Sequence, residues 1–104
     1  MADWMDVVAA NDFPPGERNI INTPYGEIAV FNLEGQYYAI EDVCSHDGGE
    51  LASGLCEGDQ IICPRHGARF CIRDGRSLTP PAYEDIDTFP VRVENGMVQV
   101  DVGD

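Results

Sequence analysis

Two short motifs bring together the residue types that bind transition metals in proteins. The motifs are Cys44-Ser45-His46 and Cys63-Pro64-Arg65-His66, and 16 residues separate them. Each motif offers one thiol and one imidazole. Thiolates favour soft or borderline metals, and imidazole suits zinc and iron alike. The spacing therefore predicts one metal centre, with either zinc or an iron–sulfur cluster, held by Cys44, His46, Cys63 and His66.

The pairing of ligand types within each motif favours iron over zinc. Zinc fingers usually pair Cys with Cys and His with His, whereas each motif here carries one of each. This arrangement resembles the Rieske [2Fe–2S] signature, in which Cys-x-His is followed by Cys-x-x-His. The resemblance implies that Cys44 and Cys63 hold one iron, while His46 and His66 hold the other. A zinc site is one alternative, and a Cys63/His66 nucleophile pair is a second, for which neither an orienting third group nor an oxyanion motif is apparent.

The resemblance to small bacterial Rieske ferredoxins covers nearly the whole chain. Outside the ligands it is carried by four stretches: 12–17 (DFPPGE), 66–70 (HGARF), 74–75 (DG) and 79–82 (TPPA). The last stretch looks like the loop that covers the cluster, where Pro81 would shield it from water. Glycine has no Cβ, so Gly48, Gly49 and Gly67 would let the backbone approach the sulfurs closely.

Two departures from the high-potential, membrane-complex branch of the family predict a low reduction potential. That branch joins its cluster loops by a disulfide at the positions that Gly49 and Arg65 occupy here. It also has hydroxyl side chains at the positions of Ala68 and Phe70, neither of which can donate a hydrogen bond to a cluster sulfur. Such bonds offset the extra negative charge of the reduced cluster. The expected potential is therefore on the order of −150 mV, in the lower part of the Rieske range.

The elements that must position these ligands are predicted to be strands, because apolar residues recur at every second position near both ends of the chain. Asn95-Gly96 predicts a two-residue hairpin turn. It would place five valines on one face: Val91, Val93, Val98, Val100 and Val102. A second hairpin is predicted over 27–33 and 36–41, around Glu34-Gly35, and shorter strands are predicted at 4–9 and 18–22. The fold class is therefore all-β.

The resemblance narrows this class to the Rieske fold, an antiparallel scaffold of the β-sandwich or barrel-like kind. Residues 42–82 hold all four cysteines and both histidines. They are predicted to form a small cluster-binding subdomain inserted into a single domain that spans residues 1–104. Cys56 and Cys71 lie outside the motifs and are expected to be unpaired, with a disulfide between them as the alternative.

The charge balance excludes several classes of partner. The chain has 104 residues, with 19 acidic and 6 basic side chains, for a net charge of −13. Such a chain repels phosphate backbones and anionic membranes, so neither is expected as a partner. No signal pattern or long apolar stretch is present, which favours a cytoplasmic location. Four arginines follow the second motif, and they are interpreted either as partners of neighbouring acids or as a patch that orients docking: Arg65, Arg69, Arg73 and Arg76.

The sequence lacks the motifs that a Rieske oxygenase or a flavin- or nicotinamide-dependent reductase would need. A Rieske oxygenase needs a second, mononuclear iron, usually held by two histidines and a carboxylate, but His46 and His66 are the only histidines here. No Gly-x-Gly-x-x-Gly motif indicates a flavin or nicotinamide site. The resemblance implies a soluble, monomeric electron carrier without a substrate site of its own. It would link an NAD(P)H-dependent flavoprotein reductase to a terminal Rieske non-haem iron oxygenase, with the outer ring edges of the two histidines as the exit route.

Two other functions fit the same ligands. One is the Rieske small subunit of a nitrite reductase-like enzyme, although such chains often lack the ligands that are all present here. The other is an electron donor or sensor associated with iron–sulfur cluster assembly.

Overall fold

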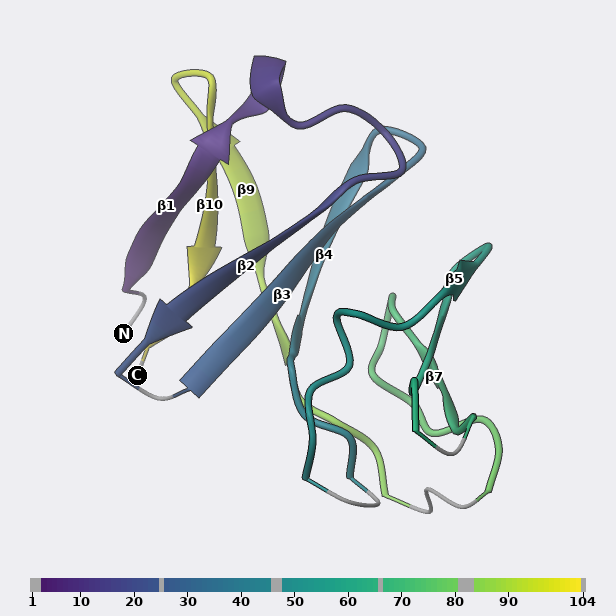
Figure 1. The fold of residues 1–104 in the computed structure, drawn as a ribbon. Coiled ribbons are helices and arrows are strands. Elements are labelled where there is room, and N and C mark those ends of the chain that lie inside the picture. Colours follow the sequence, from purple (N-terminus) through teal and green to yellow (C-terminus); the bar gives the residue numbers. More distant parts are fainter. Residues whose placement is uncertain (1–2, 25, 46–47, 66, 81–83, 104) are drawn as a thin grey trace.

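The computed structural model describes residues 3–24, 26–45, 48–65, 67–80 and 84–103, and the regular structure of these residues is nearly all β (Figure 1). The strands are β1 (Trp4–Ala9), β2 (Arg18–Thr23), β3 (Gly26–Leu33), β4 (Gln36–Glu41), β5 (Cys56–Glu57), β6 (Gln60–Ile62), β7 (Arg69–Cys71), β8 (Thr88–Phe89), β9 (Val91–Glu94) and β10 (Met97–Asp101). One 3-10 helix, η1 (Ala10–Asp12), follows β1. The all-β prediction is confirmed.

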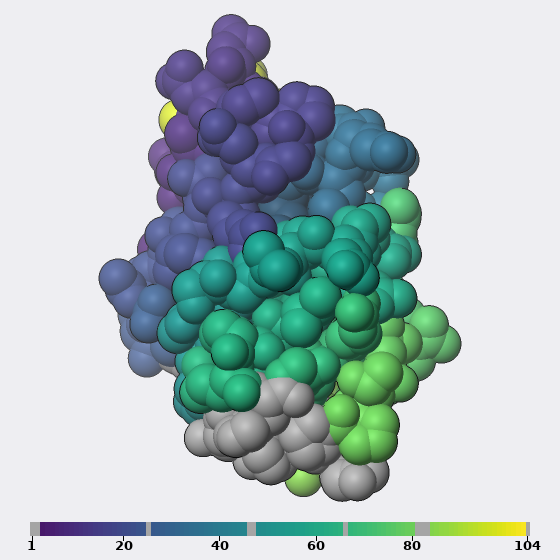
Figure 2. Space-filling view, turned by 45° about the vertical axis from the view of Figure 1, so that its right-hand side comes forward, coloured from purple at the N-terminus to yellow at the C-terminus, as the bar shows by residue number. Residues whose placement is uncertain are grey.

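The strands form three antiparallel sheets. Their orders are β1-β10-β9, β2-β3-β4-β8 and β5-β6-β7. The first two sheets make the scaffold, and the third belongs to the segment that carries the two ligand motifs. Figure 2 shows this segment, in teal and green, packed against the blue residues of the scaffold. No helix in the described part of the chain is long and apolar enough to span a bilayer.

Both predicted hairpins are present, and their turns use left-handed backbone. Asn95 and Gly96 have φ of 52° and 80°, as a type I′ turn requires. Glu34 and Gly35 have φ of 54° and 93° between β3 and β4. Glu34 is one of two non-glycine residues with positive φ among those described. The β9–β10 register pairs Val98 with Val93, so the predicted valine face exists.

That face is not uniformly buried. Val98 and Val100 on β10 are fully buried, but Val93 on β9 is 46% exposed. The reason is topological, because β10 lies between β1 and β9 whereas β9 is an edge strand of this sheet. An edge strand is covered on one side only, so its residues near the turn remain in contact with water.

The four-stranded sheet contributes to two separate cores, because β3 alternates its side chains between both faces. Ile28 and Val30 join a cluster with Val98 and Val100 of the first sheet. Ala29 and Phe31 join a second cluster with residues of the ligand-bearing segment. Seven members of the second cluster come from the ligand-bearing segment, residues 42–82, and Ile86 follows it; the seven are Cys44, Leu51, Ile61, Cys63, Ala68, Phe70 and Ile72. The scaffold therefore holds the predicted metal centre through one face of a single sheet.

Candidate metal centre

The two ligand motifs lie in loops that share one pattern of backbone hydrogen bonds. In each loop the cysteine amide donates to the carbonyl five residues later, and the cysteine carbonyl accepts from a glycine amide four residues later. The distances are 2.7 Å (Cys44 to Gly49), 2.8 Å (Gly48 to Cys44), 2.7 Å (Cys63 to Ala68) and 3.1 Å (Gly67 to Cys63). Gly48 and Gly67 have φ of 77° and 76°, a conformation that favours glycine. The backbone around the two cysteines therefore has the same local conformation in both loops.

Both predicted sulfur ligands are buried in the same apolar cluster. Cys44 is 0% exposed and Cys63 is 1% exposed, and neither forms a disulfide. Leu51, Ile61 and Phe70 belong to the cluster that contains them. An apolar, dry setting with two thiols in matching loops fits a thiolate-bound cluster, since thiolates select iron–sulfur clusters and other soft centres.

The predicted nitrogen ligands, His46 and His66, lie outside the described residues, as does Pro81. Among the residues that the structure does describe, no three His, Cys, Asp or Glu side chains gather as a metal site. The structure therefore shows Cys44 and Cys63 buried in one apolar cluster, and the assignment of all four residues as metal ligands stays a prediction.

Residues 50–55, between the first loop and β5, are held by charged side chains rather than by regular structure. The carboxylate of Asp42, a residue only 4% exposed, accepts the Leu51 and Ala52 amides at 2.7 and 2.8 Å. Arg18 donates to the Ala52 and Gly54 carbonyls from the scaffold side. A Cβ on Gly54 would meet the Ile62 carbonyl oxygen, so this position requires glycine. Asp42 and Arg18 could not be singled out from the sequence, because single charged residues in an acidic chain resemble ordinary surface residues.

The four arginines of the ligand-bearing segment have acidic neighbours, as the pairing interpretation predicted. The nitrogen–oxygen distances are 4.0 Å (Arg65–Glu50), 2.7 Å (Arg69–Glu57), 3.2 Å (Arg73–Asp59) and 3.8 Å (Arg76–Asp74). All four arginine side chains keep between 33% and 64% of their surface exposed. Exposed pairs of this kind contribute little to stability. The docking interpretation of these arginines stays a prediction.

The two remaining cysteines are unpaired, which confirms the expectation for them. Cys71 is buried, and Cys56 is exposed on β5. Desolvation of its sulfur raises the pKa of the Cys56 thiol, against a smaller lowering by the nearby Arg18. A raised pKa favours the protonated, less reactive form of this thiol.

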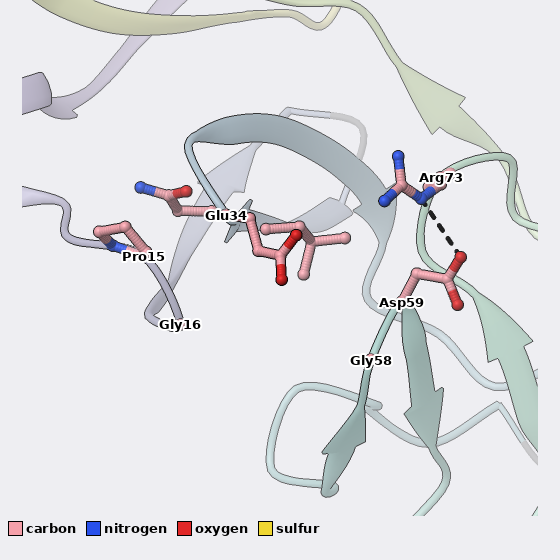
Figure 3. Close-up of a pocket in the computed structure, with 8 residues that line it drawn as sticks. Pro15, Gly16, Glu34, Gly58, Asp59 and Arg73 are labelled. Atoms are coloured by element: carbon pink, nitrogen blue, oxygen red, sulfur yellow. Dashed lines mark hydrogen bonds and ion pairs between the residues drawn. The ribbon is translucent and has the colours of Figure 1, made fainter.

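Two surface hollows lie near these elements. The first, of about 540 Å³, lies between the β3–β4 turn and the β5–β6 turn, where Arg73 pairs with Asp59 (Figure 3). None of the predicted ligands lines it. The second, of about 390 Å³, lies at the second ligand loop and is lined by Cys63, Pro64 and Leu55, the last being 75% exposed. Of these two hollows, the second is therefore the one lined by a predicted ligand.

Comparison with known proteins finds a family match and close relatives over most of the chain. The family model for the Rieske [2Fe-2S] domain matches residues 3–90. The ferredoxin component of a naphthalene 1,2-dioxygenase system from Pseudomonas aeruginosa is 34% identical over 99 residues, which are 95% of each chain. The 3-phenylpropionate/cinnamic acid dioxygenase ferredoxin subunit from Shigella flexneri is 41% identical over 92 residues, covering 88% of this chain and 86% of that protein.

A chain of one solved structure is similar to nearly the whole of this chain. That structure is described as the complex of reduced oxygenase and oxidized ferredoxin in carbazole 1,9a-dioxygenase. The TM-score is 0.89 at 35% identity, and the match covers 94% of this chain and 92% of that chain.

Proposed function

This chain belongs to the Rieske [2Fe–2S] family, and from that premise we propose that it is the ferredoxin component of a ring-hydroxylating dioxygenase system. It receives single electrons from an NAD(P)H-dependent flavoprotein reductase and passes them to a terminal Rieske non-haem iron oxygenase. It works as a soluble, cytoplasmic monomer, and residues 1–104 form one domain with a cluster-binding subdomain at about 42–82.

One observation carries the proposal: two buried cysteines, Cys44 and Cys63, occupy loops with matching hydrogen bonds within one apolar cluster. We assign these two sulfurs, together with the imidazoles of His46 and His66, as the ligands. A Rieske [2Fe–2S] cluster, when bound, supplies reversible one-electron chemistry. The chain therefore acts as a carrier of single electrons.

The chain's own residues set the environment of that centre. Leu51, Ile61 and Phe70, all fully buried, exclude water from around the two cysteines. At the two positions where the high-potential branch has hydroxyls, Ala68 and Phe70 offer none, and both are 0% exposed. An apolar surrounding disfavours the extra negative charge of the reduced state. These residues support a low reduction potential.

The comparisons favour an oxygenase as the electron acceptor over the two alternatives. The relatives are named as ferredoxins of naphthalene and phenylpropionate dioxygenase systems, and the structural neighbour comes from an oxygenase–ferredoxin complex. These names also support a carrier rather than an enzyme.

The test is reconstituted turnover with candidate flavoprotein reductases and terminal Rieske oxygenases. We expect NADH-dependent hydroxylation of an aromatic substrate only when the chain is present, and none with the Cys44→Ser variant. Turnover without the chain, or electron delivery to a nitrite reductase and not to the oxygenase, would contradict the proposal.

A further inference from the structure

One side chain of the second ligand loop lies directly over the backbone of the first. Arg65 stands between the two ligands of the second motif, and its guanidinium covers Gly49, at the end of the first loop. A Cβ built on Gly49 would lie 2.5 Å from Cζ of Arg65, 2.6 Å from Nη2 and 2.8 Å from Nε. The guanidinium plane therefore occupies the space that any larger side chain at position 49 would need.

The same guanidinium also binds the first loop through a hydrogen bond. Nη2 of Arg65 donates to the Glu50 carbonyl at 2.9 Å. The ion pair with the Glu50 carboxylate is longer, at 4.0 Å, and about half of the Glu50 side chain is exposed. An exposed pair at this distance contributes little. The backbone hydrogen bond and the contact with Gly49 therefore both link Arg65 to the backbone at 49–50.

Glu50 is itself fixed in place. Hydrogen bonds from the Ser53 hydroxyl and the Ser53 amide hold the pKa of the Glu50 carboxyl below its ordinary value. The carboxylate thus caps the turn that follows, and the Glu50 carbonyl is presented to Arg65 by an ordered backbone.

Position 49 favours glycine because of the neighbouring Arg65 side chain, and not because of the backbone conformation of Gly49. Gly48 and Gly67 have positive φ, but φ of Gly49 lies outside the left-handed region. The three atoms nearest to a Cβ built there all belong to the Arg65 side chain. An alanine at 49 would therefore displace the guanidinium, a flexible side-chain end, and leave the loop backbone free to keep its path.

We propose that Arg65 is a positioning residue that holds the two ligand loops together across Gly49, and that this contact slows the loss of the cluster. The inference rests on the proposed function, because it takes the [2Fe–2S] cluster as the group that the loops enclose. A planar, permanently charged guanidinium suits this role better than a lysine ammonium, which cannot cover a glycine and bond a carbonyl in one plane.

The first test measures cluster retention, which needs no redox partner. Loaded protein is mixed with an iron chelator, and the decay of visible absorbance is followed. We expect Arg65→Ala to lose the cluster roughly fivefold faster than the unmodified chain, the factor that corresponds to one hydrogen bond of about 1 kcal/mol. Arg65→Lys keeps the charge and should also lose the cluster faster.

Arg73→Ala is the matched control. It removes the same charge from the same subdomain, but Arg73 pairs with Asp59 and Tyr38, away from both ligand loops. Its decay rate should stay within about twofold of the unmodified chain. Equal rates for Arg65→Ala and Arg73→Ala would overturn the inference.

The second test is a double-mutant cycle with Gly49→Ala. We expect this substitution to speed cluster loss when Arg65 is present and to add almost nothing in the Arg65→Ala background, because its effect operates through the displaced guanidinium. Effects that multiply independently would contradict the inference. Gly49→Ala also carries the test by itself if Arg65→Ala fails to give a native circular dichroism spectrum.

The two proposals fail in different ways. A purified chain with neither iron nor sulfide overturns the proposed function, and the role of Arg65 falls with it. A chain that holds its cluster equally well with and without Arg65 overturns the role of Arg65 alone.

Discussion

Arg18, on strand β2 of the scaffold, donates from Nη1 to the Gly54 carbonyl at 2.7 Å, in the segment between the two ligand loops. The same nitrogen donates to the Ala52 carbonyl at 2.6 Å, and the guanidinium lies 5.6 Å from the centre of the Phe31 ring. One side chain thus joins the scaffold to residues 50–55, which have no regular structure. Stability of the scaffold and of the metal centre should therefore be coupled through Arg18.

Replacing Arg18 by Ala should lower the free energy of unfolding by about 2 kcal/mol, because two carbonyls lose a charged donor. Arg18→Lys should cost less, since an ammonium reaches one carbonyl more easily than two. Urea unfolding of the loaded protein measures both. Arg76→Ala, which removes an arginine 64% exposed, is the control and should change little. Indistinguishable unfolding midpoints for Arg18→Ala and Arg76→Ala would contradict the assigned role.

Asp42 should matter as a hydrogen-bond acceptor. Asp42→Ala leaves the buried Leu51 amide and the part-buried Ala52 amide without their partner, which should cost about 3 kcal/mol. Asp42→Asn keeps an acceptor oxygen of the same shape and should cost much less. Thermal unfolding followed by circular dichroism separates the two variants. If Asn destabilises as much as Ala, the negative charge and not the acceptor geometry holds this segment.

A hydroxyl at position 68 should raise the reduction potential. Ala68 is fully buried and follows the second ligand motif. If Ala68→Ser donates a hydrogen bond of about 1 kcal/mol to the centre, the midpoint should rise by roughly 40 mV for one electron. Protein-film voltammetry gives this value, with Ala52→Ser as a control in the same subdomain. An unmodified chain with a potential well above zero would contradict the low value that we expect.

The four cysteines should fall into two classes. Cys56→Ser and Cys71→Ala should retain iron and sulfide, because neither residue belongs to a ligand loop, with a modest loss of stability for the buried Cys71. Cys44→Ser and Cys63→Ser should lose the native visible spectrum, since both remove a predicted sulfur ligand. Iron and sulfide assays after purification show which variants retain the cluster. Retention of the unchanged spectrum by Cys63→Ser would show that the ligand assignment is wrong.

Local chemistry made much of this fold predictable from sequence. The pair Asn95-Gly96 accepts positive φ at both positions, so the C-terminal hairpin followed from two residues. The strand predicted at 4–9 coincides with β1, and the one predicted at 18–22 ends one residue short of β2. The ligand motifs could be recognised because type and spacing of four residues are chemically constrained.

Features that depend on contacts between distant parts of the chain could not be predicted from local sequence patterns. The pairing of β1 with β10 joins opposite ends of the chain, and no local pattern specifies it. Strand β8 has only two residues, which is too few for an alternation of apolar and polar side chains to be recognised in the sequence. The function of Asp42 and Arg18 depends on which backbone groups the fold brings within reach. No local pattern indicates that the Arg65 side chain occupies the space where a Cβ at position 49 would lie.

A one-electron Rieske centre is the basis of the function proposed for this chain, and coulometric titration of the anaerobically purified protein detects it. Visible absorbance is followed while electrons are added, and iron and sulfide are assayed on the same sample. We expect one electron per chain, with two irons and two sulfides. A colourless protein that contains zinc, takes up no electron and lacks sulfide would contradict the assignment of a [2Fe–2S] centre.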